Sequence, residues 1–439
     1  MSKTGQRLRP RVRDAILQSL RAGVVPRVGQ QHIQVGRAAE VEALIKDIER
    51  IADGGSAIRF IIGAYGSGKT FFLNLIRTIA LEKRLVTVSA DLAPDRRLHA
   101  SGGQARSLYQ ELTRNLATRS RAEGGALPNL VERFVTTALS EARETGKQPQ
   151  AVIHDRLHRL SELVAGYDFA EVIAAYWRGH DTGDDTLKSA AIRWLRGEFS
   201  TKTDARTALG VRTIVDDTTV YDHLKLLGLF SRLSGYGGLL VTLDELVNLY
   251  KLSSGRARKS NYEQILRILN DCLQGNAEGL GFLFGGTPDL LYDTRRGLYS
   301  YEALQSRLSQ NRFAADGLVD HSSPVISLEN LTPEDLYVLL GKLRDVHASG
   351  HDHGPLIPEE GLQAFLNHCS QRIGDAYFRT PRSTIKAFID LLEVLAQNPE
   401  TKWSDLLPNV QLEQYLGEEE GAGEGSSDED DDELASFRL

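Results

Sequence analysis

The sequence predicts an α/β fold, in which a five-stranded parallel sheet is covered by helices on both faces. Five apolar runs have the length of a strand, at residues 58–62, 85–88, 239–243, 280–284 and 325–328. Helical patterns separate these runs, which is the alternation typical of a parallel sheet. From residue 331 onwards the apolar spacing is helical only. We therefore expect an all-helical region after the sheet.

The composition is that of a globular protein and excludes a fibrous or wholly disordered chain. The 439 residues are 41% hydrophobic and 25% charged. The two cysteines, Cys272 and Cys369, are too few for a disulfide framework or a four-cysteine zinc site. No apolar run approaches the roughly 18 residues of a membrane span, and the basic N-terminus lacks the pattern of a signal peptide. We expect a cytoplasmic protein with no membrane partner.

Two helical patterns precede the first strand, and a long helical stretch interrupts the sheet. Residues 12–20 and 38–52 repeat aliphatic side chains at helical spacing, and Gly54-Gly55 ends the second pattern. The stretch from about 101 to 236 is mostly helical and much longer than a simple crossover between strands. It predicts a helical insertion.

The all-helical region begins with a clear helix start. Thr332 is a capping residue, Pro333 occupies the first helical position, and acids follow in the first turn. Further helices are predicted from about 358 to 369 and from about 380 to 397. The chain therefore divides into a core at residues 1–330, a helical region at 331–400 and a C-terminal segment at 401–439.

The end of the chain is strongly acidic. Residues 417–439 carry ten acids and one arginine, a charge of −9, which leaves +2 for the rest. The sequence pI of about 5.9 therefore does not argue against a nucleic-acid partner. We expect this tail to be disordered. A solubilising tail is the favoured interpretation, and a docking segment or a mimic of nucleic acid is the alternative.

A glycine-rich loop stands between the first strand and the next helix. It matches G-x-x-x-x-G-K-[ST], and its correct flanks argue against a chance match. Its backbone N–H groups and the helix N-terminus would bind phosphate oxygens. Lys69 would contact the β- and γ-phosphates, and the Thr70 hydroxyl would ligate Mg²⁺. The predicted nucleotide-binding residues of this loop are Gly63, Ala64, Tyr65, Gly66, Ser67, Gly68, Lys69 and Thr70, followed by Phe71.

Two adjacent acids end the third strand. Asp244 would hold Mg²⁺ through water, and Glu245 would orient the attacking water. Taken alone, a strand ending in two acids is weak evidence, and a helix-capping acid is the favoured alternative. Together with the glycine-rich loop, the pair predicts a nucleoside triphosphatase.

Three further residues are candidates for sensing or completing the site. Thr287 follows the fourth strand, where it could contact the γ-phosphate. An equally favoured alternative is that Thr287 is only a turn residue before Pro288. Arg382 starts a helix and could fold back onto the nucleotide. The alternative is an arginine that is exposed to solvent at the helix start and does not contact the nucleotide. Arg307 is a candidate arginine finger for a neighbouring subunit. Its competitors are Arg295, Arg296 and Arg312.

Basic residues follow both central strands. One group comprises Lys251, Arg256, Arg258 and Lys259, and the next loop adds Arg295 and Arg296. Such loops could meet a phosphate backbone, and solvated loops are an equal alternative. The sequence contains no Asn-Lys-x-Asp motif for reading guanine, which disfavours a Ras-like GTPase.

The order of these motifs resembles that of AAA+ ATPases. More narrowly, the chain resembles the ATP-binding proteins of bacterial BREX and related phage-defence operons (BrxC/BrxD-like), relatives of the Orc1/Cdc6-like initiator ATPases. The residues that carry the resemblance are Gly36-Arg37, 63–70, Asp244-Glu245, 285–288, 295–297, 301–304, 307–308 and 380–382.

The resemblance implies a P-loop AAA+ core with a helical insertion and a C-terminal all-helical lid. It places Gly36 and Arg37 near the adenine and gives Thr287 and Arg382 the roles of sensors 1 and 2. It implies ATP and Mg²⁺ as cofactors, DNA and a helicase as partners, and a homo-oligomer. About forty residues follow Gln397, too few for the winged helix of initiator ATPases, so any DNA contact must come from core loops, the insertion or a partner.

Two functions follow from the resemblance. In the first, the protein hydrolyses ATP and couples it to assembly on DNA or to DNA remodelling. In the second, it is a nucleotide switch with slow turnover that recruits and regulates a partner protein. The presence of Glu245 favours hydrolysis.

Overall fold

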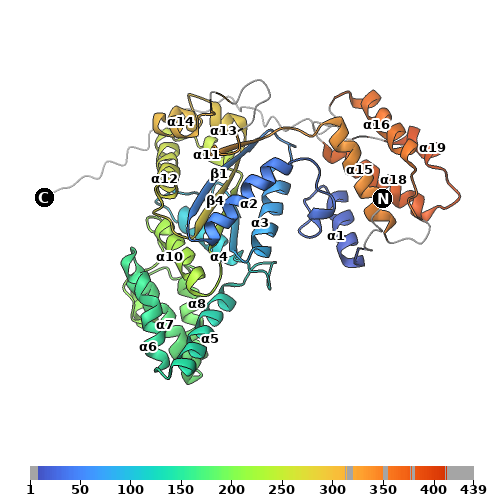
Figure 1. Ribbon diagram of the computed structural model, residues 1–439. Helices are drawn as coiled ribbons and strands as arrows, with labels where there is room; N and C mark the ends of the chain where they lie inside the picture. Colours follow the sequence, from blue (N-terminus) through green and yellow to red (C-terminus); the bar gives the residue numbers. More distant parts are fainter. Residues whose placement is uncertain are drawn as a thin grey trace.

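The computed structural model describes residues 8–311, 313, 320–349, 354–375, 377, 381–410 and 412. Within these residues five strands form one all-parallel sheet in the order β2-β3-β4-β1-β5 (Figure 1). The predicted α/β fold with a five-stranded parallel sheet is confirmed. The strands are β1 (Ser56–Gly63), β2 (Val86–Asp91), β3 (Leu239–Asp244), β4 (Leu280–Gly286) and β5 (Val325–Leu328).

Helices cover both faces of the sheet because its strands are apolar on both sides. Ile61, Leu240 and Leu283 pack against α2 and α3, while Phe60 and Phe282 belong to the core on the other face. This two-sided burial explains why the strands are continuous apolar runs in the sequence. The covering helices are α2 (Ala38–Ala52) and α3 (Lys69–Glu82) on one face, and α4 (Gln104–Arg114), α10 (Val220–Leu233) and α12 (Gly255–Gln274) on the other.

The stretch predicted as an insertion is helical in the structure. Its first and last helices, α4 and α10, lie on the sheet, and the helices between them form a lobe below it in Figure 1. Phe169 and Trp194 of the lobe meet edge to face, and Phe169 also contacts Phe230 of α10. The lobe and this face of the sheet thus share one core. The lobe consists of α5 (Leu127–Thr145), α6 (Pro149–Leu157), η2 (His158–Glu162), α7 (Gly166–Thr182), α8 (Asp185–Leu195) and α9 (Lys202–Leu209).

The C-terminal helices form a second core together with the N-terminal helix α1 (Pro10–Arg21). Ile16 of α1 is buried in the same cluster as Leu340 and Phe388. Arg21 donates to Asp390 at 2.7 Å. Figure 1 shows α1 beside these helices, at one side of the sheet. They are α15 (Pro333–Ala348), α16 (Glu359–Ile373), α18 (Pro381–Gln397), α19 (Trp403–Leu406) and η4 (Leu407–Asn409), and η1 (Gln30–His32) follows α1.

The remaining short helices follow the carboxyl ends of β3 and β4. They are α11 (Val247–Tyr250), α13 (Pro288–Tyr292), η3 (Leu298–Ser300) and α14 (Glu302–Leu308). Arg312 and the acidic tail at residues 417–439 lie outside the described residues. In the part of the chain that the structure describes, no helix is long and apolar enough to cross a bilayer.

A buried ion pair joins α2 to the first strand. The Asp47 carboxylate accepts from Arg59 Nε at 2.6 Å and from its Nη2 at 3.2 Å. Both side chains are less than 10% exposed. Arg59 also donates to the carbonyl of Ser323. The two charges therefore satisfy one another inside the protein.

Candidate functional site

The glycine-rich loop at residues 63–70, here called the glycine loop, turns tightly between β1 and α3. Gly66 and Gly68 have φ of 81° and 84°, in the left-handed region that glycine adopts without strain. At Gly63 a side chain would overlap the Ser67 hydroxyl and come within 2.8 Å of the Leu328 carbonyl. Helix α3 begins at Lys69, so its free N–H groups face the loop. These are the features of an anion-binding loop.

The Lys69 side chain folds over the glycine loop. Its Nζ donates to the carbonyls of Gly63 and Ala64 at 2.8 and 3.0 Å and lies 5.7 Å from the centre of the exposed Tyr65 ring. Burial lowers the pKa of Lys69, and the charges of Asp244 and Glu245 oppose this shift. The ammonium thus has neutral oxygens as its hydrogen-bond partners, and two carboxylates lie within electrostatic range.

Thr70 contacts the acid at the end of β3, although β4 lies between β1 and β3 in the sheet. Thr70 Oγ1 donates to Asp244 Oδ2 at 2.8 Å, and the Glu245 N–H donates to Asp244 Oδ1 at 2.8 Å. A side chain on Gly285 of β4 would overlap that second oxygen. The absence of a side chain at Gly285 therefore lets Asp244 extend across the end of β4. A hydroxyl beside a carboxylate is a donor set that suits Mg²⁺.

Glu245 holds a backbone conformation that glutamate rarely adopts. Its φ is 56°, in the left-handed region, which is strained for a residue with a side chain. It is half buried, and burial together with the Asp244 charge raises the pKa of its carboxyl, while Lys69 opposes the shift. Strain and raised pKa values cluster at functional sites.

Asp91 is an acid of this site that the sequence analysis did not single out. It ends β2 opposite Asp244 in the strand register. Burial raises the pKa of Asp91, and the Asp244 charge raises it further. Its place at the end of a strand was a usable signal, because the carboxyl ends of parallel strands meet at one edge of the sheet.

The Thr287 hydroxyl is buried and has no hydrogen-bond partner among the described residues, and the same holds for Ser67 Oγ. Thr287 is 7% exposed, and its hydroxyl does not cap the helix α13 that it precedes. Ile62 pairs with Gly286, so Thr287 follows β4 next to the start of the glycine loop. Buried polar groups without partners are rare and costly. Two such hydroxyls beside an anion-binding loop fit a triphosphate.

Gly36 and Arg37 connect the glycine loop to the C-terminal helices. Arg37 donates to the Ser67 carbonyl at 3.4 Å and to the Glu329 carbonyl, just after β5. The Asp335 carboxylate of α15 lies against Gly36. Phe71, one residue after the loop, packs against the C-terminal core. Contacts from the loop, and from Gly36 and Arg37 beside it, therefore reach the second core.

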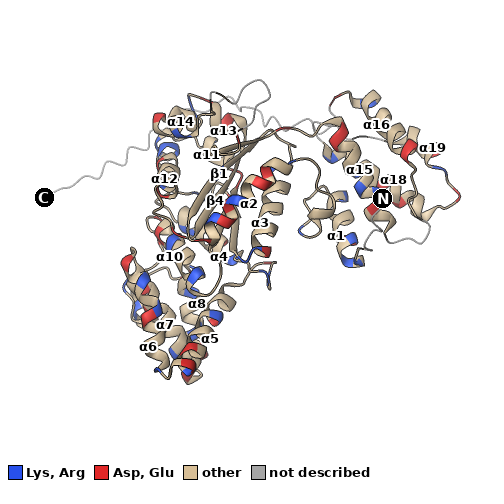
Figure 2. Cartoon of the chain, in the orientation of Figure 1, with Lys and Arg blue, Asp and Glu red and all other residues tan. Residues whose placement is uncertain are grey.

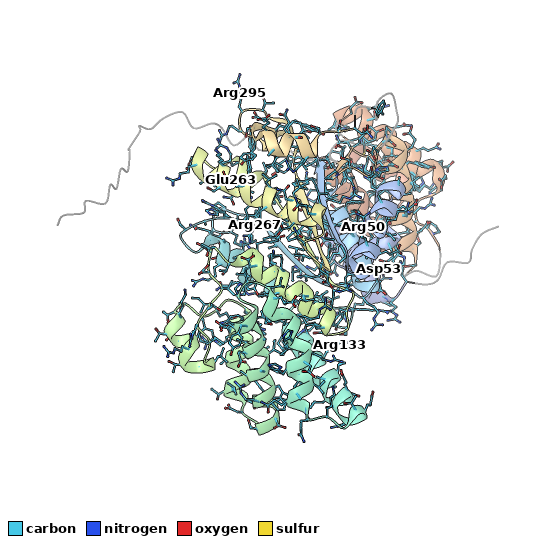
Figure 3. All side chains as sticks on the ribbon, turned by 60° about the vertical axis from the view of Figure 1, so that its left-hand side comes forward. Arg50, Asp53, Arg133, Glu263, Arg267 and Arg295 are labelled. Carbon is cyan, nitrogen blue, oxygen red and sulfur yellow. The ribbon has the colours of Figure 1, made fainter. Side chains whose placement is uncertain are left out.

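The predicted arginines lie in other surroundings. Arg307 is exposed on α14, and its Nη1 donates to the Ala303 carbonyl of the same helix at 2.8 Å. The Arg382 guanidinium lies against Gly23, which follows α1. Arg296 donates to the carbonyls of Tyr250 and Leu252 at 3.3 Å. Arg295 is exposed, at the outer edge of the molecule in Figure 3.

Comparison with known proteins connects this site to a family. The family model for the BREX system ATP-binding protein BrxC/D matches residues 8–411, nearly the whole chain. No curated protein matches the sequence significantly. The match includes the glycine loop, the acid pair and the C-terminal helices. The chain therefore belongs to the BrxC/D family of ATP-binding proteins of the BREX system.

Proposed function

We propose that this protein is a P-loop AAA+ ATPase that binds ATP with Mg²⁺ at the glycine loop and hydrolyses it. The observation that carries the proposal is the 2.8 Å hydrogen bond from Thr70 to Asp244, with Lys69 and Glu245 in electrostatic range of the same carboxylate. Hydrolysis of a phosphoanhydride needs charge neutralisation and a positioned water, and these four side chains supply both.

Each residue has a defined task in this mechanism. Lys69 exchanges its two carbonyl partners for β- and γ-phosphate oxygens. Thr70 and Asp244 hold Mg²⁺, which when bound neutralises charge that develops on the phosphates. Glu245 orients the attacking water and accepts its proton. The free hydroxyl of Thr287 donates to a γ-phosphate oxygen, the role of sensor 1.

The remaining assignments follow the family resemblance. Residues 1–330 form the ATPase core, residues 331–400 the lid and residues 401–439 a C-terminal segment with an acidic tail. The resemblance gives Arg382 the role of sensor 2, which would require its guanidinium to leave Gly23 and turn to the nucleotide. Arg307, exposed on α14, acts as the finger in a neighbouring copy of a homo-oligomer. Within the BREX system, ATP turnover is coupled to assembly on DNA or its remodelling, with a helicase as partner.

A nucleotide switch with slow turnover is the second candidate function. The observation that favours it is the bridge made by Arg37, whose guanidinium contacts both the glycine loop at Ser67 and the exit of β5 at Glu329. Nucleotide in the loop would change the first contact, and the second leads directly into α15. The bound nucleotide could therefore set the position of the C-terminal helices without frequent hydrolysis.

Steady-state ATP hydrolysis tests the proposal, with ATP binding measured in parallel. Glu245→Gln should retain ATP binding and lower turnover by about 10²- to 10⁴-fold, the usual contribution of a general base. Glu263→Gln, an exposed acid on α12 outside the site, is the matched control and should turn over like wild type. If the wild-type protein binds ATP but does not turn it over, the switch is the better description. Equal turnover in wild type and Glu245→Gln would remove Glu245 from the mechanism.

A further inference from the structure

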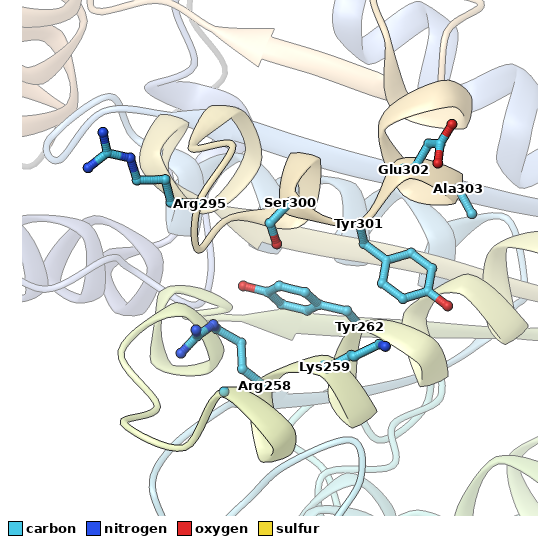
Figure 4. Close-up of a pocket in the computed structure, with 9 residues that line it drawn as sticks. Arg258, Lys259, Tyr262, Arg295, Ser300, Tyr301, Glu302 and Ala303 are labelled. Carbon is cyan, nitrogen blue, oxygen red and sulfur yellow. The ribbon is translucent and has the colours of Figure 1, made fainter.

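A basic crease lies on the surface between α12 and the segment that follows β4. Figure 4 shows it between the first turns of α12 and the stretch from η3 to α14. It encloses about 600 Å³. Its base is formed by Tyr262, which is 2% exposed and donates from its hydroxyl to the Arg296 carbonyl at 2.7 Å. The side chains of the crease are Arg258, Lys259, Tyr262, Arg295, Ser300, Tyr301 and Glu302.

The crease carries an excess of positive charge. The lining contains three cations, Arg258, Lys259 and Arg295, and one acid, Glu302. None of the three cations forms an ion pair with any residue that the structure describes, and Asp293 interacts with the Arg295 guanidinium only through space. Arg258 is held in place by a 2.7 Å hydrogen bond to the Leu252 carbonyl. Figure 2 shows basic bands on the turns of α12 nearest to α14. Cations gathered without carboxylate partners attract a polyanion.

The form of the crease suits a phosphate backbone better than a single anion. Its cations come from two separate segments of the chain, and in Figure 4 the Arg295 guanidinium points outward, away from Arg258 and Lys259. Contacts spread along an open surface match successive phosphates of a strand, and arginine and lysine are the usual partners of such phosphates. We propose that the basic crease binds the phosphate backbone of DNA.

Both walls of the crease connect to residues of the proposed ATPase site. Helix α12 follows Glu245 through the short α11, and the segment from η3 to α14 follows Thr287. The Tyr250 hydroxyl donates to Asp293 at 2.9 Å, which ties these two segments together. DNA in the crease would contact α12 and the segment from η3 to α14 at the same time. We therefore expect DNA binding there to raise ATP turnover. This consequence rests on the proposed ATPase activity, whereas binding of DNA to the crease can be measured without ATP hydrolysis.

Binding of fluorescein-labelled duplex DNA, measured by anisotropy at several salt concentrations, tests the crease. Arg258→Glu with Lys259→Glu should weaken DNA binding at least about tenfold. The slope of the logarithm of the binding constant against the logarithm of the salt concentration should become shallower, by the amount that corresponds to about two phosphate contacts. Lys202→Glu with Arg206→Glu changes the charge equally on exposed positions of α9 and should leave DNA binding near the wild-type value. Lys259→Glu alone, at an exposed side chain, provides a milder variant if the double substitution does not fold.

ATP turnover and oligomeric state complete the test. Basal turnover without DNA should be unchanged in the crease variants, while stimulation by DNA is lost. The inference is wrong if wild type does not bind DNA, if crease and control variants bind it equally, or if the crease variants alter self-assembly while the assembled fraction binds DNA normally. If the wild-type protein showed no ATP turnover, with or without DNA, that result would contradict the proposed ATPase function. It would leave the conclusion about DNA binding unchanged.

Discussion

Two buried carboxylates in this protein have opposite surroundings. Asp47 accepts two hydrogen bonds from the Arg59 guanidinium, so its charge is matched within the fold. Asp244 is bound by a neutral hydroxyl and a backbone N–H, and the charges of Asp91 and Glu245 interact with it unfavourably. The first arrangement is complete without a ligand. The second leaves negative charge that a bound cation would relieve, and this difference separates a structural acid from the acid that we propose holds Mg²⁺.

The largest expected effect is the loss of the structural acid. Asp47→Ala leaves the Arg59 charge buried without its carboxylate, which should reduce the free energy of unfolding by about 3–5 kcal/mol. ATP turnover per folded molecule should not change. Urea unfolding and turnover measured on the same preparation check both statements. Glu49→Ala, which removes an exposed ion pair with Lys83, is the control and should change stability by less than about 1 kcal/mol.

Gly285→Ala should damage the functional acid with little harm to the fold. The new methyl group would overlap the Asp244 carboxylate and displace it from Thr70. We expect turnover to fall about ten- to a hundredfold, equivalent to about 1.4–2.7 kcal/mol. Gly286→Ala is the matched control, since a methyl group there meets the flexible ends of Leu290 and Ile62 instead. Similar turnover in the two variants would contradict the inference that Asp244 extends across the end of β4 to contact Thr70.

Glu245→Gly should stabilise the protein while it abolishes turnover. Glycine relieves the left-handed backbone at φ 56° and removes a carboxylate repelled by Asp244. The expected gain in the free energy of unfolding is about 1 kcal/mol, because the greater freedom of glycine in the unfolded chain offsets part of the relief. Thermal unfolding of Glu245→Gly and Glu245→Gln separates the two effects. Both variants remove the charge, but only Glu245→Gly also removes the side chain from the left-handed position. A less stable Glu245→Gly variant would mean that the conformation is not strained.

The acid side of the pH–rate profile gives the smallest expected effect. Glu245 must be ionised to accept a proton, and burial together with Asp244 raises the pKa of its carboxyl above 4.5. Turnover should therefore fall on acidification at a pH higher than an ordinary glutamate would give. Asp91→Asn removes one of the charges that raise this pKa and should move the acid limb to lower pH. If turnover of Asp91→Asn fell at the same acidic pH as turnover of wild type, a group other than Glu245 would control the acid limb.

Local patterns in the sequence predicted the elements of the fold because their causes are local. The apolar run at residues 58–62 became the centre of β1, and the helical spacing at 38–52 became α2 with the same ends. The glycine loop was equally predictable, since its chemistry depends on fixed spacing between neighbours. These features need only the alternation of polar and apolar side chains and the turn residues between them.

Contacts that depend on strand order could not be predicted in the same way. The need for glycine at position 285 follows from β4 lying between β1 and β3, which no local pattern reveals. The pairing of Asp47 with Arg59 is close in sequence, but it requires knowing which side of β1 faces α2. Asp91 joins the site only through its register with Asp244.

The shared core of α1 and the C-terminal helices has a consequence for how the chain is made. Helix α1 leaves the ribosome early, but the helices that bury Ile16 are synthesised more than 300 residues later. During that interval the apolar side of α1 has no permanent partner, and closing so long a loop is slow. We expect the sheet to fold first and this second core to be the late step of biogenesis, the stage at which a chaperone would help most.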